Sequence, residues 1–126
     1  MVKLLAQESE VCTFVADGET SAAELRDAYQ ALSLAPPHRT LFDLTSATAE
    51  RIDLDTMLDL ARRQAEVGHR RLRLSRAALV CTRDPDYSMA RALVTAVLLE
   101  GLPIRVAVFA EREAAKAWLD SSGAAA

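Results

Sequence analysis

Short runs with strand character alternate with helical patterns along the whole chain, and this alternation constrains the fold more than any other feature of the sequence. Runs of apolar and β-branched residues predict strands at 3–6, 11–15, 39–45, 77–82 and 104–109. Apolar residues spaced three and four apart predict helices at 21–32, 52–67, 84–100 and 111–119. The predicted order of elements is therefore β-β-α-β-α-β-α-β-α.

Capping and turn residues mark the ends of these predicted helices. Ser21 and Glu24 have the capping-box spacing, in which a hydroxyl and a carboxylate each satisfy a free backbone N–H. The segment 84–86 is expected to cap the third helix. Gly68 and Gly101 are expected to end the second and third helices.

The alternation itself indicates a fold class. Strands joined by a helix favour a parallel pair with a right-handed crossover, whereas the two opening strands are joined by a few residues and should form an antiparallel hairpin. We expect an α/β fold, with a mixed, mostly parallel sheet of about five strands and helices packed on it. A chain of 126 residues fits one domain. That domain should span 1–120, followed by a frayed tail at 121–126.

Charge and hydropathy argue against several classes of protein. The formal net charge of −3 argues against a general nucleic-acid binder. No apolar stretch approaches the roughly 20 residues that cross a bilayer, and the first residues lack a signal-peptide pattern, so we expect a cytoplasmic protein without a transmembrane segment. Cys12 and Cys81 lie in apolar runs and not in a metal-binding or redox spacing. We therefore expect two buried thiols, no metal and no cofactor.

Three stretches of sequence carry a family resemblance. They are Ile52-Asp53 at the start of the second predicted helix, Tyr87 to Arg91 in the third, and Val108-Phe109 followed by Ala114 to Leu119. Together with the order of elements, they resemble the SpoIIAA-like group of STAS-fold proteins over nearly the whole chain. The resemblance implies a mixed sheet and self-association. It also implies kinship with anti-sigma-factor antagonists and domains of anion transporters, and a fold related to CRAL-TRIO lipid-binding domains.

One feature of that superfamily can be compared residue by residue. Anti-sigma-factor antagonists carry an Asp-Ser-Ser-Gly type motif whose first serine accepts a phosphoryl group. In this chain the motif would fall on 53–56, where Leu54 stands at the acceptor position and Thr56 at the glycine position. Leucine has no hydroxyl to receive the doubly charged group. The sequence therefore argues against a kinase-controlled partner switch in its standard form.

Polar residues at the carboxyl ends of the third and fourth predicted strands form a candidate ligand-binding rim. Ligands of open α/β sheets bind at this edge, where helix N-termini direct positive partial charge. The rim residues are Asp43, Thr45, Ser46, Arg83, Tyr87 and Arg91. They could bind a small anionic or polar ligand, or they could be caps and turn formers only. Asp43, beside an apolar strand, could have a raised pKa.

The third predicted helix is apolar nearly all round. A helix on a sheet buries one stripe, so its other apolar side chains need a further partner. The candidate face consists of Leu93, Val94, Val97 and Leu98. We expect a second copy of the chain to cover it. The alternative is an apolar pocket for a hydrophobic small molecule, such as an acyl chain. That pocket would be lined by Leu93, Val97, Met57, Leu58 and Phe42.

A basic run follows the second predicted helix and contains Arg70, Arg71, Arg73 and Arg76. Guanidinium groups can bind phosphates, acidic lipids or an acidic partner. The run equally fits a solvated loop at a helix C-terminus, where cations are favoured by the helix dipole. Both interpretations stay open.

Signatures of known enzyme classes are missing from the sequence. It has no glycine-rich phosphate loop and no nucleophile elbow, and His38 and His69 have no paired ligand spacing. We therefore expect a non-catalytic regulatory or interaction module that acts as a homodimer and could bind another protein. The first alternative is a carrier or sensor of a hydrophobic small molecule or lipid. The second is an enzyme at the rim around Asp43, Arg83 and Tyr87.

Overall fold

A computed structural model describes residues 3–8, 11–17, 20–30, 39–46, 52–70 and 75–121 of the chain. The strands are β1 (Lys3–Glu8), β2 (Val11–Asp17), β3 (Arg39–Ser46), β4 (Ser75–Val80) and β5 (Ile104–Phe109). The helices are α1 (Ala22–Gln30), α2 (Leu54–Arg70), α3 (Asp84–Glu100) and α4 (Arg112–Asp120). The predicted alternation and the α/β class are confirmed.

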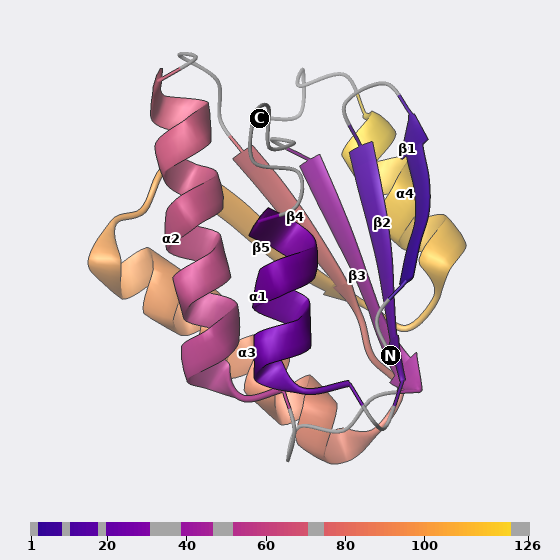
Figure 1. The fold of residues 1–126 in the computed structure, drawn as a ribbon. Coiled ribbons are helices and arrows are strands. Elements are labelled where there is room, and N and C mark those ends of the chain that lie inside the picture. Colours follow the sequence, from indigo (N-terminus) through magenta and orange to yellow (C-terminus); the bar gives the residue numbers. More distant parts are fainter. Residues whose placement is uncertain are drawn as a thin grey trace.

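The strands form one sheet, in which their spatial order β1-β2-β3-β4-β5 is the same as their order in the chain (Figure 1). β2, β3, β4 and β5 run parallel to one another, and β1 pairs antiparallel with β2. Helices α1, α2 and α3 cover one face, and α4 packs against the other, where it contacts β3, β4 and β5. Because β2, β3, β4 and β5 are parallel, their carboxyl ends meet at one edge of the sheet.

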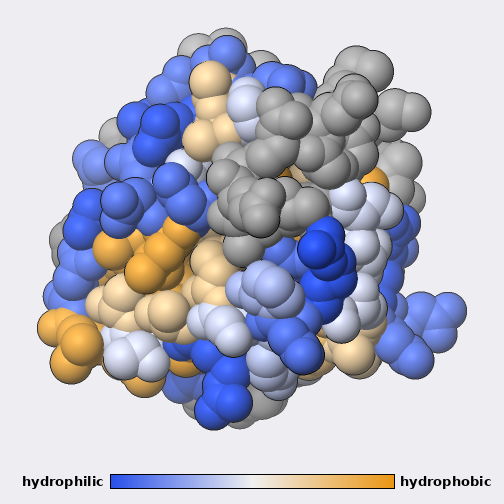
Figure 2. All heavy atoms as spheres, turned by 90° about the horizontal axis from the view of Figure 1, so that it is seen from below, coloured by the Kyte–Doolittle hydropathy of each residue, from blue (hydrophilic) through white to orange (hydrophobic). Residues whose placement is uncertain are grey.

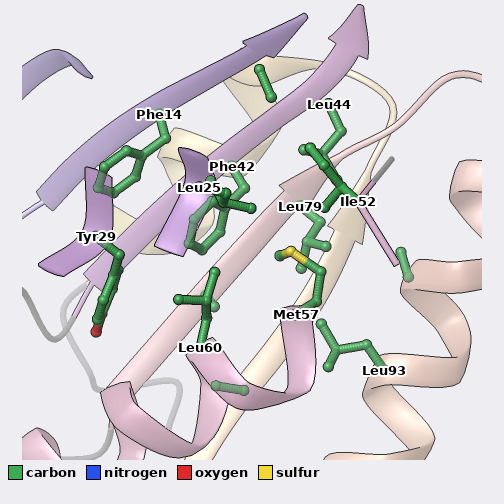
Figure 3. Packing of buried hydrophobic residues seen from close by; sticks show 14 of the residues in the cluster. Phe14, Leu25, Tyr29, Phe42, Leu44, Ile52, Met57, Leu60, Leu79 and Leu93 are labelled. Carbon is green, nitrogen blue, oxygen red and sulfur yellow. The ribbon is translucent and has the colours of Figure 1, made fainter. Parts of the chain in front are cut away.

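Residues of the central strands are buried on both faces of the sheet, as expected for parallel strands between helices. Phe14, Phe42 and Leu79 belong to the main core beneath α1, α2 and α3 (Figure 3). Leu41 and Val80 belong to a smaller cluster with α4. Burying a side chain of this size contributes about 1.5–3 kcal/mol. These two apolar layers therefore hold the sheet and helices together.

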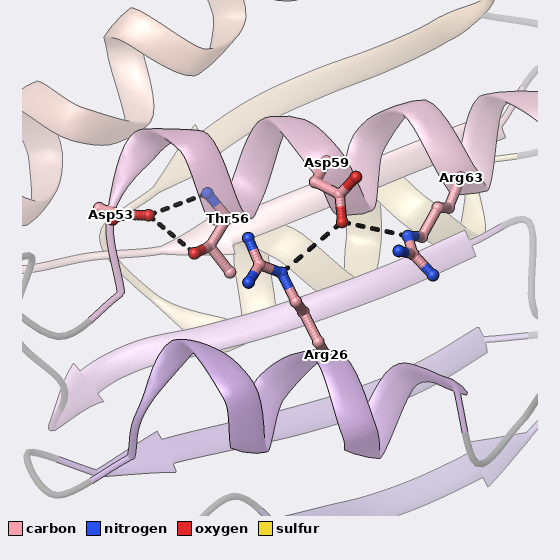
Figure 4. Close-up of polar contacts among 5 residues, drawn as sticks. All are labelled: Arg26, Asp53, Thr56, Asp59 and Arg63. Atoms are coloured by element: carbon pink, nitrogen blue, oxygen red, sulfur yellow. Dashed lines mark hydrogen bonds and ion pairs between the residues drawn. The ribbon is translucent and has the colours of Figure 1, made fainter.

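Side chains cap the first two helices. Ser21 Oγ accepts a hydrogen bond of 3.2 Å from the backbone N–H of Glu24, which confirms the hydroxyl half of the predicted capping box. Asp53 Oδ1 accepts bonds from the backbone N–H and from the hydroxyl of Thr56, at 2.9 and 2.7 Å (Figure 4). Thr56 is buried. Its hydroxyl thus serves the cap and does not replace the serine that is missing at Leu54.

One predicted helix end and one predicted helix cap are wrong. α2 continues two residues past Gly68, because the further backbone hydrogen bonds outweigh a glycine penalty of about 1 kcal/mol. In α3 the N-cap residue is Arg83, which makes no side-chain cap, and the segment 84–86 already lies inside the helix. Pro85 is favourable in this first turn, where its missing N–H has no helical partner to lose. The predicted end at Gly101 is confirmed by its left-handed φ of 65°.

Several predicted features lie outside the described residues: the end of the first helix at 31–32, His38, the basic residues 71–74 and the tail at 122–126. The side chains of residues 67–70 lie outside them as well. Within the described part of the chain, no helix combines the length and the hydropathy needed to span a bilayer.

Candidate functional site

The outer side of α3 carries the large hydrophobic side chains that remain exposed. Among the described residues these are Tyr87, Leu98 and Leu99, with exposed fractions of 41%, 74% and 83%. Seen from below, hydrophobic side chains gather on this side of the molecule (Figure 2). The exposed side of the helix is named the α3 face, and it consists of Tyr87, Ser88, Arg91, Ala92, Thr95, Leu98 and Leu99.

The inner side of α3 is a separate stripe that packs on the sheet. Leu93 and Val97 are 1% and 2% exposed and belong to the main core. These two residues are therefore not available to a partner, which corrects half of the predicted interaction face. Of the other two predicted residues, Val94 is half-buried and Leu98 is exposed. Because nearly every position of this helix is apolar, the spacing did not show which side meets the sheet, and Leu99 was missed.

Apart from its large hydrophobic residues, the α3 face carries small side chains and one charged residue, Arg91. Ser88, Ala92 and Thr95 are exposed. Thr95 donates its hydroxyl to the backbone carbonyl of Arg91, at 3.3 Å. The Arg91 guanidinium forms no ion pair with any described residue. The last turn of α3 contains no basic residue of its own.

An open groove of about 240 Å³ lies beyond the C-terminal end of α3. It is lined by Arg62, Ala65, Glu66, Leu102 and Pro103. Arg62 also holds Glu100, the last residue of α3, through two hydrogen bonds of 2.9 Å. The residues predicted to line an apolar pocket lie elsewhere. Phe42, Met57, Leu93 and Val97 are buried together in the main core, and Leu58 packs against it.

At the carboxyl edge of the sheet, a buried aspartate forms an ion pair with a partly exposed arginine. Asp43 is 5% exposed. Its Oδ1 accepts bonds from the backbone N–H and the hydroxyl of Thr45, at 3.0 and 2.7 Å. Its Oδ2 accepts bonds from Nε and Nη2 of Arg112, at 3.0 and 2.5 Å. Both carboxylate oxygens are thus occupied by the protein itself, and the pair ties the start of α4 to β3.

The pKa of Asp43 is shifted in the direction opposite to the prediction. Burial alone would raise its pKa, but the hydrogen bonds from Thr45 and Arg112 outweigh burial and hold the pKa below its ordinary value. The prediction of a raised pKa was wrong because Arg112, far away in the sequence, was not identified as the partner.

The other predicted rim residues do not join this pair. Ser46, Arg83, Tyr87 and Arg91 are exposed. Within the described residues, none of them forms a hydrogen bond or ion pair with the Asp43–Arg112 pair. The structure therefore brings together Asp43 and Thr45 only, and it leaves Tyr87 and Arg91 on the α3 face. In the described part of the chain, no cluster of His, Cys, Asp and Glu side chains is arranged to hold a metal ion.

Arg76, the last member of the basic run, has a structural role. It is 5% exposed. Its Nη1 donates to the carbonyls of Trp118 and Ser121 at 3.1 and 2.8 Å, and to Ser121 Oγ at 3.1 Å. The guanidinium also lies 5.7 Å from the centre of the Trp118 ring. Arg76 therefore neutralises the C-terminal end of α4, and Ser121 is fixed to it, contrary to the prediction of a frayed tail from residue 121.

Both cysteines are expected to resist thiol reagents in the folded protein. Burial raises the pKa of the Cys81 thiol to about 12, with smaller contributions from the charges of Asp86 and Asp43. Burial also raises the pKa of Cys12. Because the thiolate is the reactive form, an aromatic disulfide reagent at neutral pH should label neither thiol until denaturant is added. Fast labelling of one thiol in the native protein would contradict this prediction.

Comparison of the chain with models of protein families, with curated proteins and with solved structures finds no significant match. The resemblance to the SpoIIAA-like group therefore stays a prediction.

Proposed function

We propose that this chain is a non-catalytic regulatory or interaction module that acts as a homodimer through its α3 face. The observation that carries the proposal is the position of the exposed large hydrophobic side chains, which in the described residues all lie on α3. A helix on a sheet needs a single apolar stripe, and Leu93 and Val97 already provide it. The second apolar side of this helix is explained by a partner.

The size of the hydrophobic surface supports a partner of modest area. Leu98 and Leu99 are mostly exposed, and full burial of a leucine side chain contributes about 1.5–3 kcal/mol. In a two-fold dimer both copies contribute the same patch, so each leucine position supplies two buried side chains per dimer. That doubling makes a second copy the partner that gains most from a small patch, and the self-association that the SpoIIAA-like resemblance implies agrees with it.

The other functions considered have weaker support. An enzyme at the rim would need a free acid or base, whereas both oxygens of Asp43 accept hydrogen bonds from Thr45 and Arg112. A carrier of a hydrophobic small molecule would need an internal pocket, whereas Met57 and Leu93, two of its predicted lining residues, are buried in the packed core. The α3 face needs neither a free carboxylate nor a cavity.

The double substitution Leu98→Glu/Leu99→Glu is expected to make the protein monomeric. It places two charges per copy in the proposed interface, and the dissociation constant of the dimer should rise at least about tenfold, which is about 1.4 kcal/mol. Sedimentation equilibrium over a range of concentrations measures it. The matched control is Ala114→Glu/Ala117→Glu, which adds the same charges at two exposed positions of α4. A wild-type protein that is monomeric at every concentration, or a double variant that still dimerises, would overturn the proposal.

A further inference from the structure

The α3 face is uneven along its length. In its N-terminal half the small residues Ser88 and Ala92 are exposed one turn apart, next to the larger side chains of Tyr87 and Arg91. Toward the C-terminal end it carries two large side chains, Leu98 and Leu99, which are the most exposed large hydrophobics of the described chain. Thr95 lies between the two halves. A partner that fits this face must fill the space above Ala92 and leave room for Leu98.

We infer that a second copy packs its α3 against this α3 in an antiparallel arrangement, with the two-fold axis passing beside Thr95. This inference rests on the proposed homodimer and specifies its geometry. In an antiparallel pair centred on Thr95, each residue of one copy faces the residue equally far on the other side of the centre. The helix rise of about 1.5 Å per residue places Arg91 and Leu99 about 6 Å on either side of that centre.

Steric fit favours the antiparallel pair. In this arrangement Leu98, three residues after the centre, faces Ala92 of the other copy, three residues before the centre, so a large side chain packs over a small one. Small residues allow helices to approach closely, and large ones fill the space beside them. A parallel pair would place Leu98 and Leu99 against the same leucines of the other copy. It would leave a gap between the two Ala92 side chains.

Charge complementarity favours the same arrangement. The guanidinium of Arg91 has no ion-pair partner among the described residues. The antiparallel pair brings it level with the last turn of the other α3, which has no basic residue of its own and ends at Glu100. Each oxygen of Glu100 accepts one bond from Arg62, so each retains capacity for a second donor. A parallel pair would instead bring the two Arg91 side chains together.

Disulfide cross-linking tests the arrangement. One protein carries Ala92→Cys, and a second protein, distinguished by mass, carries Leu98→Cys. Both positions are exposed, whereas the native Cys12 and Cys81 are buried. Under mild oxidation, the mixture should give a disulfide-linked heterodimer as the main product, and each variant alone should remain mostly uncross-linked. Oxidised wild-type protein is the control for the native thiols, and intact-mass spectrometry identifies the products.

The outcomes separate the geometry from the proposed function. A mixed cross-link without self-cross-links supports the antiparallel pair. Self-cross-links of each variant would overturn it in favour of a parallel pair. Absence of cross-links in a protein that sedimentation shows to be dimeric would overturn this geometry and leave the proposed homodimer standing. A protein that sediments as a monomer would overturn both.

Discussion

Replacing Arg76 with alanine is expected to lower the free energy of unfolding by about 2–4 kcal/mol, because hydrogen bonds from a charged group contribute about 1.5–3 kcal/mol each and these share one nitrogen. The substitution removes three bonds from Nη1 to Trp118 and Ser121. It also leaves a cavity, since Arg76 is buried beside the Trp118 ring. The C-terminal end of α4 would then carry negative partial charge without a compensating cation.

Urea unfolding followed by fluorescence measures this effect directly. Trp118 is the only tryptophan in the sequence, so its emission reports on α4 itself. Arg76→Lys keeps the charge but has no planar fork, and we expect it to be intermediate. The matched control is Arg63→Ala, which removes an exposed arginine paired with Asp59 and should cost less than about 1 kcal/mol. Equal unfolding midpoints for Arg76→Ala and Arg63→Ala would contradict the assigned role.

Arg76 also shows how sequence reading loses information at an element boundary. The four arginines between 70 and 76 suggested one basic loop, and the predicted strand began at residue 77. In the structure β4 begins at Ser75. Arg76 therefore lies on the same face of the strand as Ala78 and Val80, the face that α4 covers. The two-residue period contained that signal. Starting the strand two residues earlier would have placed this arginine on a buried face.

The fold itself was predictable because it depends on periodicity, which is local. Strand alternation, the apolar spacing of α2 and the left-handed Gly101 act through neighbouring residues, and they gave the order of elements. The orientation of α3 was not predictable in the same way. With apolar residues on nearly all sides, the helix has no preferred face until the sheet selects Leu93 and Val97. The exposed pair Leu98 and Leu99 then remains for a partner.

The prediction of a raised pKa for Asp43 failed for a different reason. An aspartate beside a buried strand indicates a raised pKa when burial dominates. The outcome depends on whether a cation reaches it, and Arg112 comes from α4, at the other end of the chain. Nothing local to Asp43 identifies that partner.

Removing the guanidinium of Arg112 is expected to have the second large effect on stability. Arg112→Met is expected to lower the free energy of unfolding by about 2–4 kcal/mol at neutral pH; loss of one member of a fully buried pair costs about 3–5 kcal/mol, and the partial exposure of Arg112 reduces that figure. The variant leaves the Asp43 carboxylate buried, with Thr45 as its remaining donor. Asp43→Asn/Arg112→Met removes both charges and should recover part of the loss, because no unpaired charge is then buried.

The pH dependence provides the sharper test. The folded pKa of Asp43 lies below its ordinary value, so its contribution to stability is fully present above the unfolded pKa of about 3.9 and is lost as the pH falls through the folded pKa. In Arg112→Met the counter-ion is gone, and burial then favours the protonated carboxyl. The stability difference between wild type and this variant should therefore be largest near neutral pH. It should begin to shrink as the pH falls through the raised pKa of Asp43 in the variant, above about 3.9, and should level off below the lowered pKa of Asp43 in wild type. Urea unfolding of wild type, both single variants and the double variant across this range gives the coupling energy at each pH. A difference that stays constant with pH would show that Arg112 stabilises the protein by packing and not by holding the charge of Asp43.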